Sequence, residues 1–227
     1  QCSSLTQLIL PPIFYSIGYS GFNKCSSLKQ ITIPSSVTSI DCYAFHECSS
    51  LTEIIIPSSV TSIGHNCFEM CSLITQITIP SKVTRIEKYT FANCTSLKRV
   101  DIPSSVNFID EYAFYDCKSL IEIKIPESVT TIYDYTFFAC KSLIKVEMPK
   151  KLRSIKRAAF NGCSLLTNIL IPSTVTEIHE LAFCSCFSLT EIKIPSKIIE
   201  LRYSILCNCS SLTKLTIPSK TQVIGMD

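Results

Sequence analysis

A cysteine recurs every 23 residues along this 227-residue chain, with no insertion between neighbouring copies. The series consists of Cys2, Cys25, Cys48, Cys71, Cys94, Cys117, Cys140, Cys163, Cys186 and Cys209. A fixed period of about 20 to 50 residues is typical of solenoids, in which each copy packs only against its neighbours. We therefore predict a single repeat solenoid over residues 1–227, with nine full repeats at 2–208 and a partial tenth at 209–227.

Each repeat, numbered from its cysteine, predicts two short strands. Positions 7 and 9 are aliphatic, as in Ile31 and Ile33, and position 10 is proline in all ten copies, as in Pro34. Alternating apolar residues indicate a strand, and proline, which cannot donate to a sheet ladder, marks its end. Positions 13 and 16 are mostly apolar, and their spacing of three predicts a bent or very short second strand.

The end of each repeat predicts one helical or 3₁₀ turn. Position 20 is usually small and position 21 is phenylalanine in eight copies, as in Ala113 and Phe114. Asn93 and Asn208 end two of these turns and also match the N-glycosylation acceptor pattern. Because asparagine tolerates the left-handed conformation of a helix cap, capping accounts for both without a sugar.

Eight of the 23 positions are predicted to point inward, and one repeat is too small to cover them. Stacking buries them as ladders of Cys, Leu, Ile, Val and Phe. The unit L-x-x-I-x-I-P-S-S-V-T-S-I-x-x-x-A-F-x-x-C resembles the BspA-like leucine-rich-repeat family over essentially the whole chain. The resemblance implies a curved leucine-rich-repeat solenoid with a parallel sheet along one side. Members are often surface proteins of anaerobic bacteria and parasitic protists, several are linked to adhesion, and the family motif names no catalytic residues.

Composition narrows the classes of partner. The chain is 46% hydrophobic and 17% charged with a net charge of +3, which argues against disorder and against a strongly basic nucleic-acid surface. This segment contains no run of about 18 apolar residues, so we expect no membrane insertion in it. Both ends stop inside the repeat pattern, so we expect flanking segments or further repeats in the natural chain. The oligomeric state is left open.

Fourteen cysteines raise the question of disulfides or zinc. Neighbouring ladder cysteines are expected about 4.8 Å apart with parallel side chains, which suits a reduced, buried ladder better than disulfides. Cys42, Cys67, Cys184 and Cys207 are extra. The last two share position 22 in successive repeats, and a disulfide between them is left open. Cys184 with Cys186 and Cys207 with Cys209 could supply four thiolates to zinc, but this is disfavoured, because Cys186 and Cys209 belong to the ladder and should face away from the other cysteine of each pair.

No catalytic or cofactor constellation is recognisable. His46, His65 and His179 fall at different repeat positions without an accompanying carboxylate cluster or nucleophile, so we interpret them as solvated surface residues. The five glycines form no phosphate-binding loop, and no inserted loop exists to carry catalytic groups. We therefore expect neither an enzyme nor a metal or cofactor protein.

The outward strand positions, 6 and 8, are the candidate binding face. In the fifth to seventh copies they carry charges of opposite sign on neighbouring strands, which predicts a checkerboard, and the ninth copy is charged again. The residues concerned are Arg99, Asp101, Glu122, Lys124, Lys145, Glu147, Glu191 and Lys193. Such pairs can simply keep the sheet soluble and fix its register. The functional hypothesis is a surface or extracellular module that binds a host-cell or matrix protein; the alternative is a cytoplasmic protein-interaction scaffold.

Overall fold

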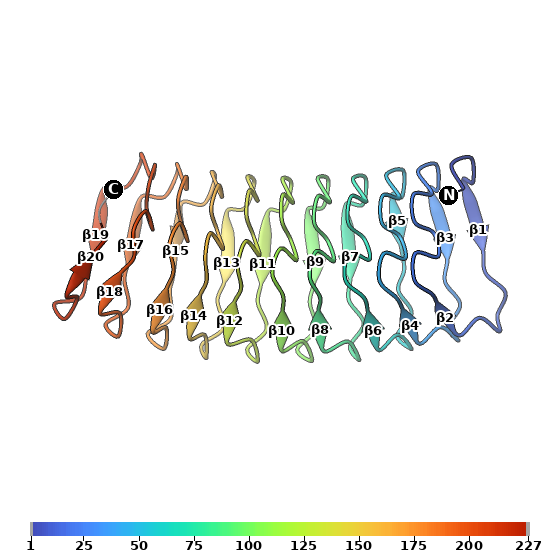
Figure 1. The fold of residues 1–227 in the computed structure, drawn as a ribbon, viewed down its shortest axis with the longest axis horizontal. Coiled ribbons are helices and arrows are strands. Elements are labelled where there is room, and N and C mark those ends of the chain that lie inside the picture. Colours follow the sequence, from blue (N-terminus) through green and yellow to red (C-terminus); the bar gives the residue numbers. More distant parts are fainter. Residues whose placement is uncertain (1, 226–227) are drawn as a thin grey trace.

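A computed structural model describes residues 2–225 as a stack of coils, each built from one 23-residue repeat. Figure 1 shows the coils in a single row along the long axis, with the two ends of the chain at opposite ends of the row. The odd-numbered strands form one row along the stack and the even-numbered strands form another (Figure 1). This is the leucine-rich-repeat-like solenoid of short parallel strands that the sequence predicts.

The first strand of each repeat occupies positions 6 to 8. These strands are β1 (Gln7–Ile9), β3 (Gln30–Thr32), β5 (Glu53–Ile54), β7 (Gln76–Thr78), β9 (Arg99–Asp101), β11 (Glu122–Lys124), β13 (Lys145–Glu147), β15 (Asn168–Ile169), β17 (Glu191–Lys193) and β19 (Lys214–Thr216). In most of them the central residue is buried and its two neighbours are exposed. Proline follows two residues after position 8, as predicted, and ends each strand.

The second strand is very short, as its spacing predicts. These two-residue strands are β2 (Ser16–Ile17), β4 (Ser39–Ile40), β6 (Ser62–Ile63), β8 (Arg85–Ile86), β10 (Phe108–Ile109), β12 (Thr131–Ile132), β14 (Ser154–Ile155), β16 (Glu177–Ile178), β18 (Glu200–Leu201) and β20 (Val223–Ile224). A turn closed by the position-13 amide on the proline carbonyl joins the two strands, as in Val37 to Pro34 at 3.0 Å.

All strand pairing is parallel, and each residue pairs with its equivalent one repeat later, as Gln30 does with Glu53. The first-strand sheet is nevertheless divided into four ladders, β1-β3-β5, β7-β9, β11-β13 and β15-β17-β19. No ladder joins β5 to β7, β9 to β11 or β13 to β15.

The predicted helical or 3₁₀ turn is wrong: residues 2–225 contain reverse turns at this place and no helix. In the third repeat the amides of Phe68 and Met70 donate to Thr90 and Ala92 of the next repeat, both at 2.9 Å. The Cys71 amide donates back to Phe68 at 3.1 Å. Every second amide of this segment donates to a carbonyl of the next repeat, so the segment cannot form a continuous helical hydrogen-bond pattern.

Two residues of this segment, at repeat positions 19 and 23, have left-handed backbone conformations. Tyr112 and Asp116 have φ of 57° and 56°, and the same angles recur in neighbouring repeats. Asn93 and Asn208 lie at position 23 with φ of 59° and 57°, which matches the left-handed role expected of them.

The core is a set of ladders running the length of the stack. Its largest members are seven fully buried phenylalanines at repeat position 21. This phenylalanine ladder consists of Phe45, Phe68, Phe91, Phe114, Phe137, Phe160 and Phe183. Successive rings stack at centroid distances of 5.3 to 5.7 Å. Such offset stacking adds to the hydrophobic gain of burying each ring.

The cysteine ladder consists of free thiols, as predicted. Each interior thiol donates to the position-21 carbonyl that lies 26 residues earlier, as Cys71 does to Phe45 and Cys117 to Phe91, both at 3.1 Å. That carbonyl oxygen also accepts a hydrogen bond from the cysteine amide of its own turn. The thiol therefore occupies the second lone pair of the carbonyl oxygen. Burial raises the pKa of the Cys94 thiol to about 12, which keeps it protonated.

Cys184 and Cys207 form a disulfide, with Cα atoms 4.6 Å apart. The bond joins equivalent positions of adjacent repeats and so links the last two full repeats covalently. Cys184 is buried and Cys207 is half-buried.

Candidate functional site: the charged sheet face

The sheet face is defined here as the outward side chains of the odd-numbered strands. On β9, β11 and β13 these side chains are all charged and exposed, while Val100, Ile123 and Val146 point inward between them. The strand register places Glu122 beside Lys145. The same register places Lys124 beside Glu147, so the expected alternation of charges between these two strands is present.

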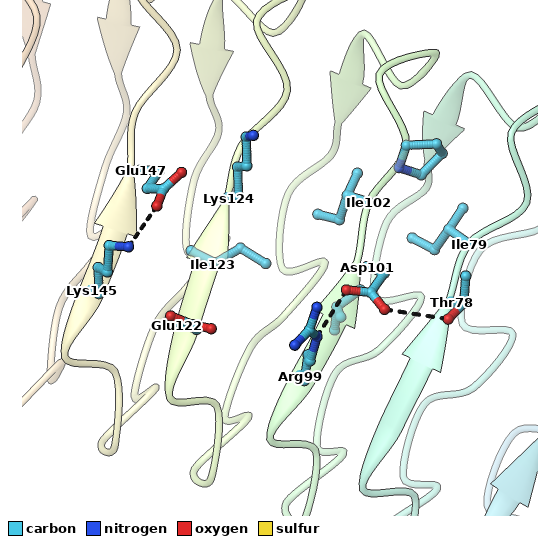
Figure 2. A pocket seen from close by; sticks show the side chains of 12 residues that line it. Thr78, Ile79, Arg99, Asp101, Ile102, Glu122, Ile123, Lys124, Lys145 and Glu147 are labelled. Atoms are coloured by element: carbon cyan, nitrogen blue, oxygen red, sulfur yellow. Dashed lines mark hydrogen bonds and ion pairs between the residues drawn. The ribbon is translucent and has the colours of Figure 1, made fainter.

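The ion pairs of β9 and β13 close within the strand. The Nε of Arg99 donates to Oδ1 of Asp101 at 2.9 Å, and Nζ of Lys145 lies 2.6 Å from Oε1 of Glu147 (Figure 2). The predicted pairing between neighbouring strands is therefore replaced here by pairing between residues two apart. Residues i and i+2 lie on the same side of a strand, within reach of a long basic side chain.

These pairs shift pKa values in the expected directions. The hydrogen bond and charge of Asp101 raise the pKa of Arg99, and those of Lys145 lower the pKa of Glu147. Both groups are fully exposed to solvent, so screening keeps the energetic contribution of each pair small.

The central strand, β11, is different. Within residues 2–225, neither Glu122 nor Lys124 forms an ion pair. The strand β17 has the same Glu-Ile-Lys sequence, but there Glu191 lies 2.8 Å from Lys214 of the next strand. Two strands of identical sequence thus present different free charges, because their neighbours differ.

A hollow of about 400 Å³ lies over β7, β9, β11 and β13, at the place where no ladder joins β9 to β11. It is lined by six of the predicted face residues, namely Arg99, Asp101, Glu122, Lys124, Lys145 and Glu147. The half-buried Ile102 adds apolar surface, the buried Ile79 and Ile123 lie beneath the hollow, and Thr78 contacts Asp101 at 3.5 Å (Figure 2). Glu191 and Lys193 lie outside the hollow, farther along the sheet on β17.

Sequence reasoning did not anticipate an aromatic strip on the turn side of the stack. Tyr112 stacks on Tyr89 at 4.7 Å and on Tyr135 at 4.9 Å, and Lys88 lies 5.4 Å from the Tyr112 ring centroid. The recurrence of tyrosine at position 19 in three successive repeats was the available signal. Since the rings cover one another, the strip stabilises repeat stacking.

The histidines are more engaged than the surface interpretation predicts. His46 contacts Asn23 at 3.1 Å and Glu69 at 3.3 Å, with 15% of its side chain exposed. His179 lies 3.3 Å from Glu177. Nowhere in residues 2–225 do three or more potential ligands gather into a metal site. That part of the chain also has no helix long and apolar enough to cross a membrane.

A sequence profile described as "BspA type Leucine rich repeat region (6 copies)" matches residues 1–121 and again residues 107–227. The chain belongs to this BspA-type leucine-rich-repeat family. Membership is consistent with a protein-binding repeat module, and leucine-rich-repeat solenoids are typically non-catalytic. No curated protein sequence matches the chain.

Solved structures of other leucine-rich-repeat proteins share the fold. A protein from Bacteroides ovatus matches with 27% identity and a TM-score of 0.66, over 99% of this chain and 76% of the other. One from Eubacterium ventriosum matches with 22% identity and a TM-score of 0.63, over 96% and 80%. The pneumococcal vaccine antigen PcpA matches with 20% identity and a TM-score of 0.61, over 96% and 62%. The last two likenesses concern the fold alone.

Proposed function

We propose that this BspA-type array is an adhesin-type module, displayed at a cell surface, that binds a host-cell or matrix protein through the sheet face. The observation that carries the proposal is the contrast between an invariant core and a variable outward face. The phenylalanine and cysteine ladders hardly change from repeat to repeat, whereas the side chains over β9, β11 and β13 change sign.

A stacked sheet suits recognition because it is rigid before the partner arrives. Its backbone is fixed by hydrogen bonds between repeats, so little conformational entropy is lost on binding. Charges of both signs steer and orient a partner more than they add affinity. The hollow at the β9–β11 gap supplies a concave place on this surface.

The disulfide supports display outside the cytoplasm. Disulfides persist mainly in oxidising compartments, and Cys184–Cys207 joins equivalent turns of two adjacent repeats. The free cysteine ladder favours the alternative, a cytoplasmic scaffold. Its interior thiols are buried and burial raises their pKa, as for Cys117, so they stay protonated and also survive in an oxidising environment.

Binding of the labelled, folded array to intact host cells and immobilised matrix proteins tests the proposal. A triple charge reversal on the sheet face, Arg99→Glu, Lys124→Glu and Lys145→Glu, is expected to abolish saturable binding. Heat-unfolded protein serves as the background.

The matched control reverses three exposed lysines on the turn that follows each first strand, Lys82→Glu, Lys151→Glu and Lys220→Glu. It changes the net charge equally and is expected to bind normally. Equal loss in both triple variants would show a general charge effect and remove the sheet face from the proposal. Absence of saturable binding by the folded protein would favour the scaffold alternative.

A further inference from the structure

The strand β11 carries a free carboxylate and a free ammonium group in the middle of the sheet face. Glu122 and Lys124 are both exposed, and neither forms an ion pair in the part of the chain that the structure describes. The charges on either side are already engaged within their own strands, Arg99 by Asp101 and Lys145 by Glu147. Lys145 and Glu147 lie beside Glu122 and Lys124 and interact with them by charge alone. Among β9, β11 and β13, β11 is therefore the strand where an incoming pair of charges has no ion pair to displace.

The spacing of these two groups fits an extended chain. Residues two apart in a strand are separated by about 6.6 Å, and an extended peptide places its own alternate side chains at the same spacing. Side chains on neighbouring strands are about 4.8 Å apart, which differs from the spacing of alternate side chains in an extended peptide. A peptide thus matches both charges only when it runs along the strand direction, parallel or antiparallel to β11.

The hollow lies beside this strand. It borders β11 at the gap where no ladder joins that strand to β9, and the half-buried Ile102 contributes apolar surface to its lining. A peptide lying along β11 can therefore place uncharged side chains against apolar surface while its charged side chains meet Glu122 and Lys124.

We propose that β11 and the adjoining hollow bind an extended segment of a partner protein with a basic and an acidic residue two positions apart. The basic side chain pairs with Glu122 and the acidic one with Lys124. This inference rests on the proposed function, because it names the kind of segment that the sheet face recognises.

The chain contains its own control site. β17 repeats the Glu-Ile-Lys sequence, but Lys214 already engages Glu191 at 2.8 Å. The lining of the hollow does not extend to Glu191 or Lys193. If sequence alone determined binding, both strands would bind equally; the structure favours β11.

The test uses two blocked nine-residue peptides of identical composition. In the first, Lys-Thr-Glu-Thr-Lys-Thr-Glu-Thr-Lys, both charges fall on one face of the extended chain. In the second, Lys-Glu-Thr-Thr-Lys-Glu-Thr-Thr-Lys, each face carries one sign only. Binding to the complete 227-residue chain is measured at low salt by ¹H–¹⁵N chemical-shift titration. We expect the first peptide to bind about fivefold more tightly, as two exposed ion pairs allow, with shifts centred on β11.

The double substitution Glu122→Gln and Lys124→Gln is expected to remove the difference between the peptides. The matched substitution Glu191→Gln and Lys193→Gln is expected to leave it unchanged. Equal binding of both peptides, no detectable binding of the first, or equal effects of the two double substitutions would overturn the inference. Cell binding that persists in the Glu122→Gln and Lys124→Gln variant would leave the proposed function standing while this inference fails.

Discussion

Replacing Phe114 with alanine removes a ring from the middle of the phenylalanine ladder. Phe114 is 0% exposed and stacks on Phe91 and Phe137, each at 5.4 Å. Truncating a buried phenylalanine typically costs about 3 to 5 kcal/mol. Because two stacked contacts are lost together, we expect the upper part of this range, about 4 to 5 kcal/mol.

Phe22→Ala is the matched control. Phe22 occupies the same repeat position, but it is only partly buried and stacks on a single ring, Phe45, at 5.5 Å. We expect it to lose about 2 kcal/mol, since less area and one neighbour are involved. The difference between the two sites follows from stacking between nearest neighbours.

Urea denaturation followed by far-ultraviolet circular dichroism measures both costs, and hydrogen exchange locates them. Protection in the Phe114→Ala protein should fall first in the three repeats that contain Phe91, Phe114 and Phe137, since loss of coupling at two repeat interfaces weakens the stack locally. The reasoning is refuted if Phe114→Ala costs no more than Phe22→Ala, or if exchange accelerates uniformly along the chain.

Three further predictions concern the cysteines and one acidic residue. Replacing Cys184 and Cys207 by alanine should lower the free energy of unfolding by about 3 kcal/mol, since the disulfide spans a sequence separation of 23 residues. Calorimetry should measure this loss, and hydrogen exchange should place it in the last two full repeats. Alkylation of the native protein followed by mass spectrometry should label the exposed Cys2 first and leave the interior cysteine ladder unmodified until unfolding, because burial raises the pKa of those thiols. Glu177, whose pKa is lowered to about 2 chiefly by a hydrogen bond from Lys156, should contribute stability that is complete above its ordinary pKa of 4.5 and is lost as the pH falls toward 2. The difference in melting temperature between the native protein and Glu177→Gln should shrink over that interval; a constant difference would contradict the assignment.

The repeat determined the strands because their cause is local and periodic. Position 10 proline cannot extend a ladder, and alternating aliphatic residues before it have one side to bury, as with Ile31 and Ile33. The prediction of a helical turn was wrong because the reverse turns that form instead depend on hydrogen bonds to the next repeat. The amides of Phe68 and Met70 donate to carbonyl oxygens of the next repeat. The sequence of one repeat does not show where those carbonyl groups lie.

The candidate site divides in the same way. The sequence determined that charged side chains alternate over β9, β11 and β13, since a two-residue period and a 23-residue repeat place them on one face. Only the tertiary structure decided which charges are free. Arg99 turns to Asp101 within its own strand, so Glu122 remains unpaired in the described chain, whereas the identical strand β17 loses its carboxylate to Lys214.

The sequence by itself determined the solenoid, its core ladders and its outward face, because these follow from periodicity and burial. The tertiary structure decided the hydrogen bonds between turns, the Cys184–Cys207 disulfide and the gap beside β11. Each of these depends on how closely and at what angle one repeat lies on the next. That relation arises from the sum of many contacts across the interface between repeats, and no single position encodes it.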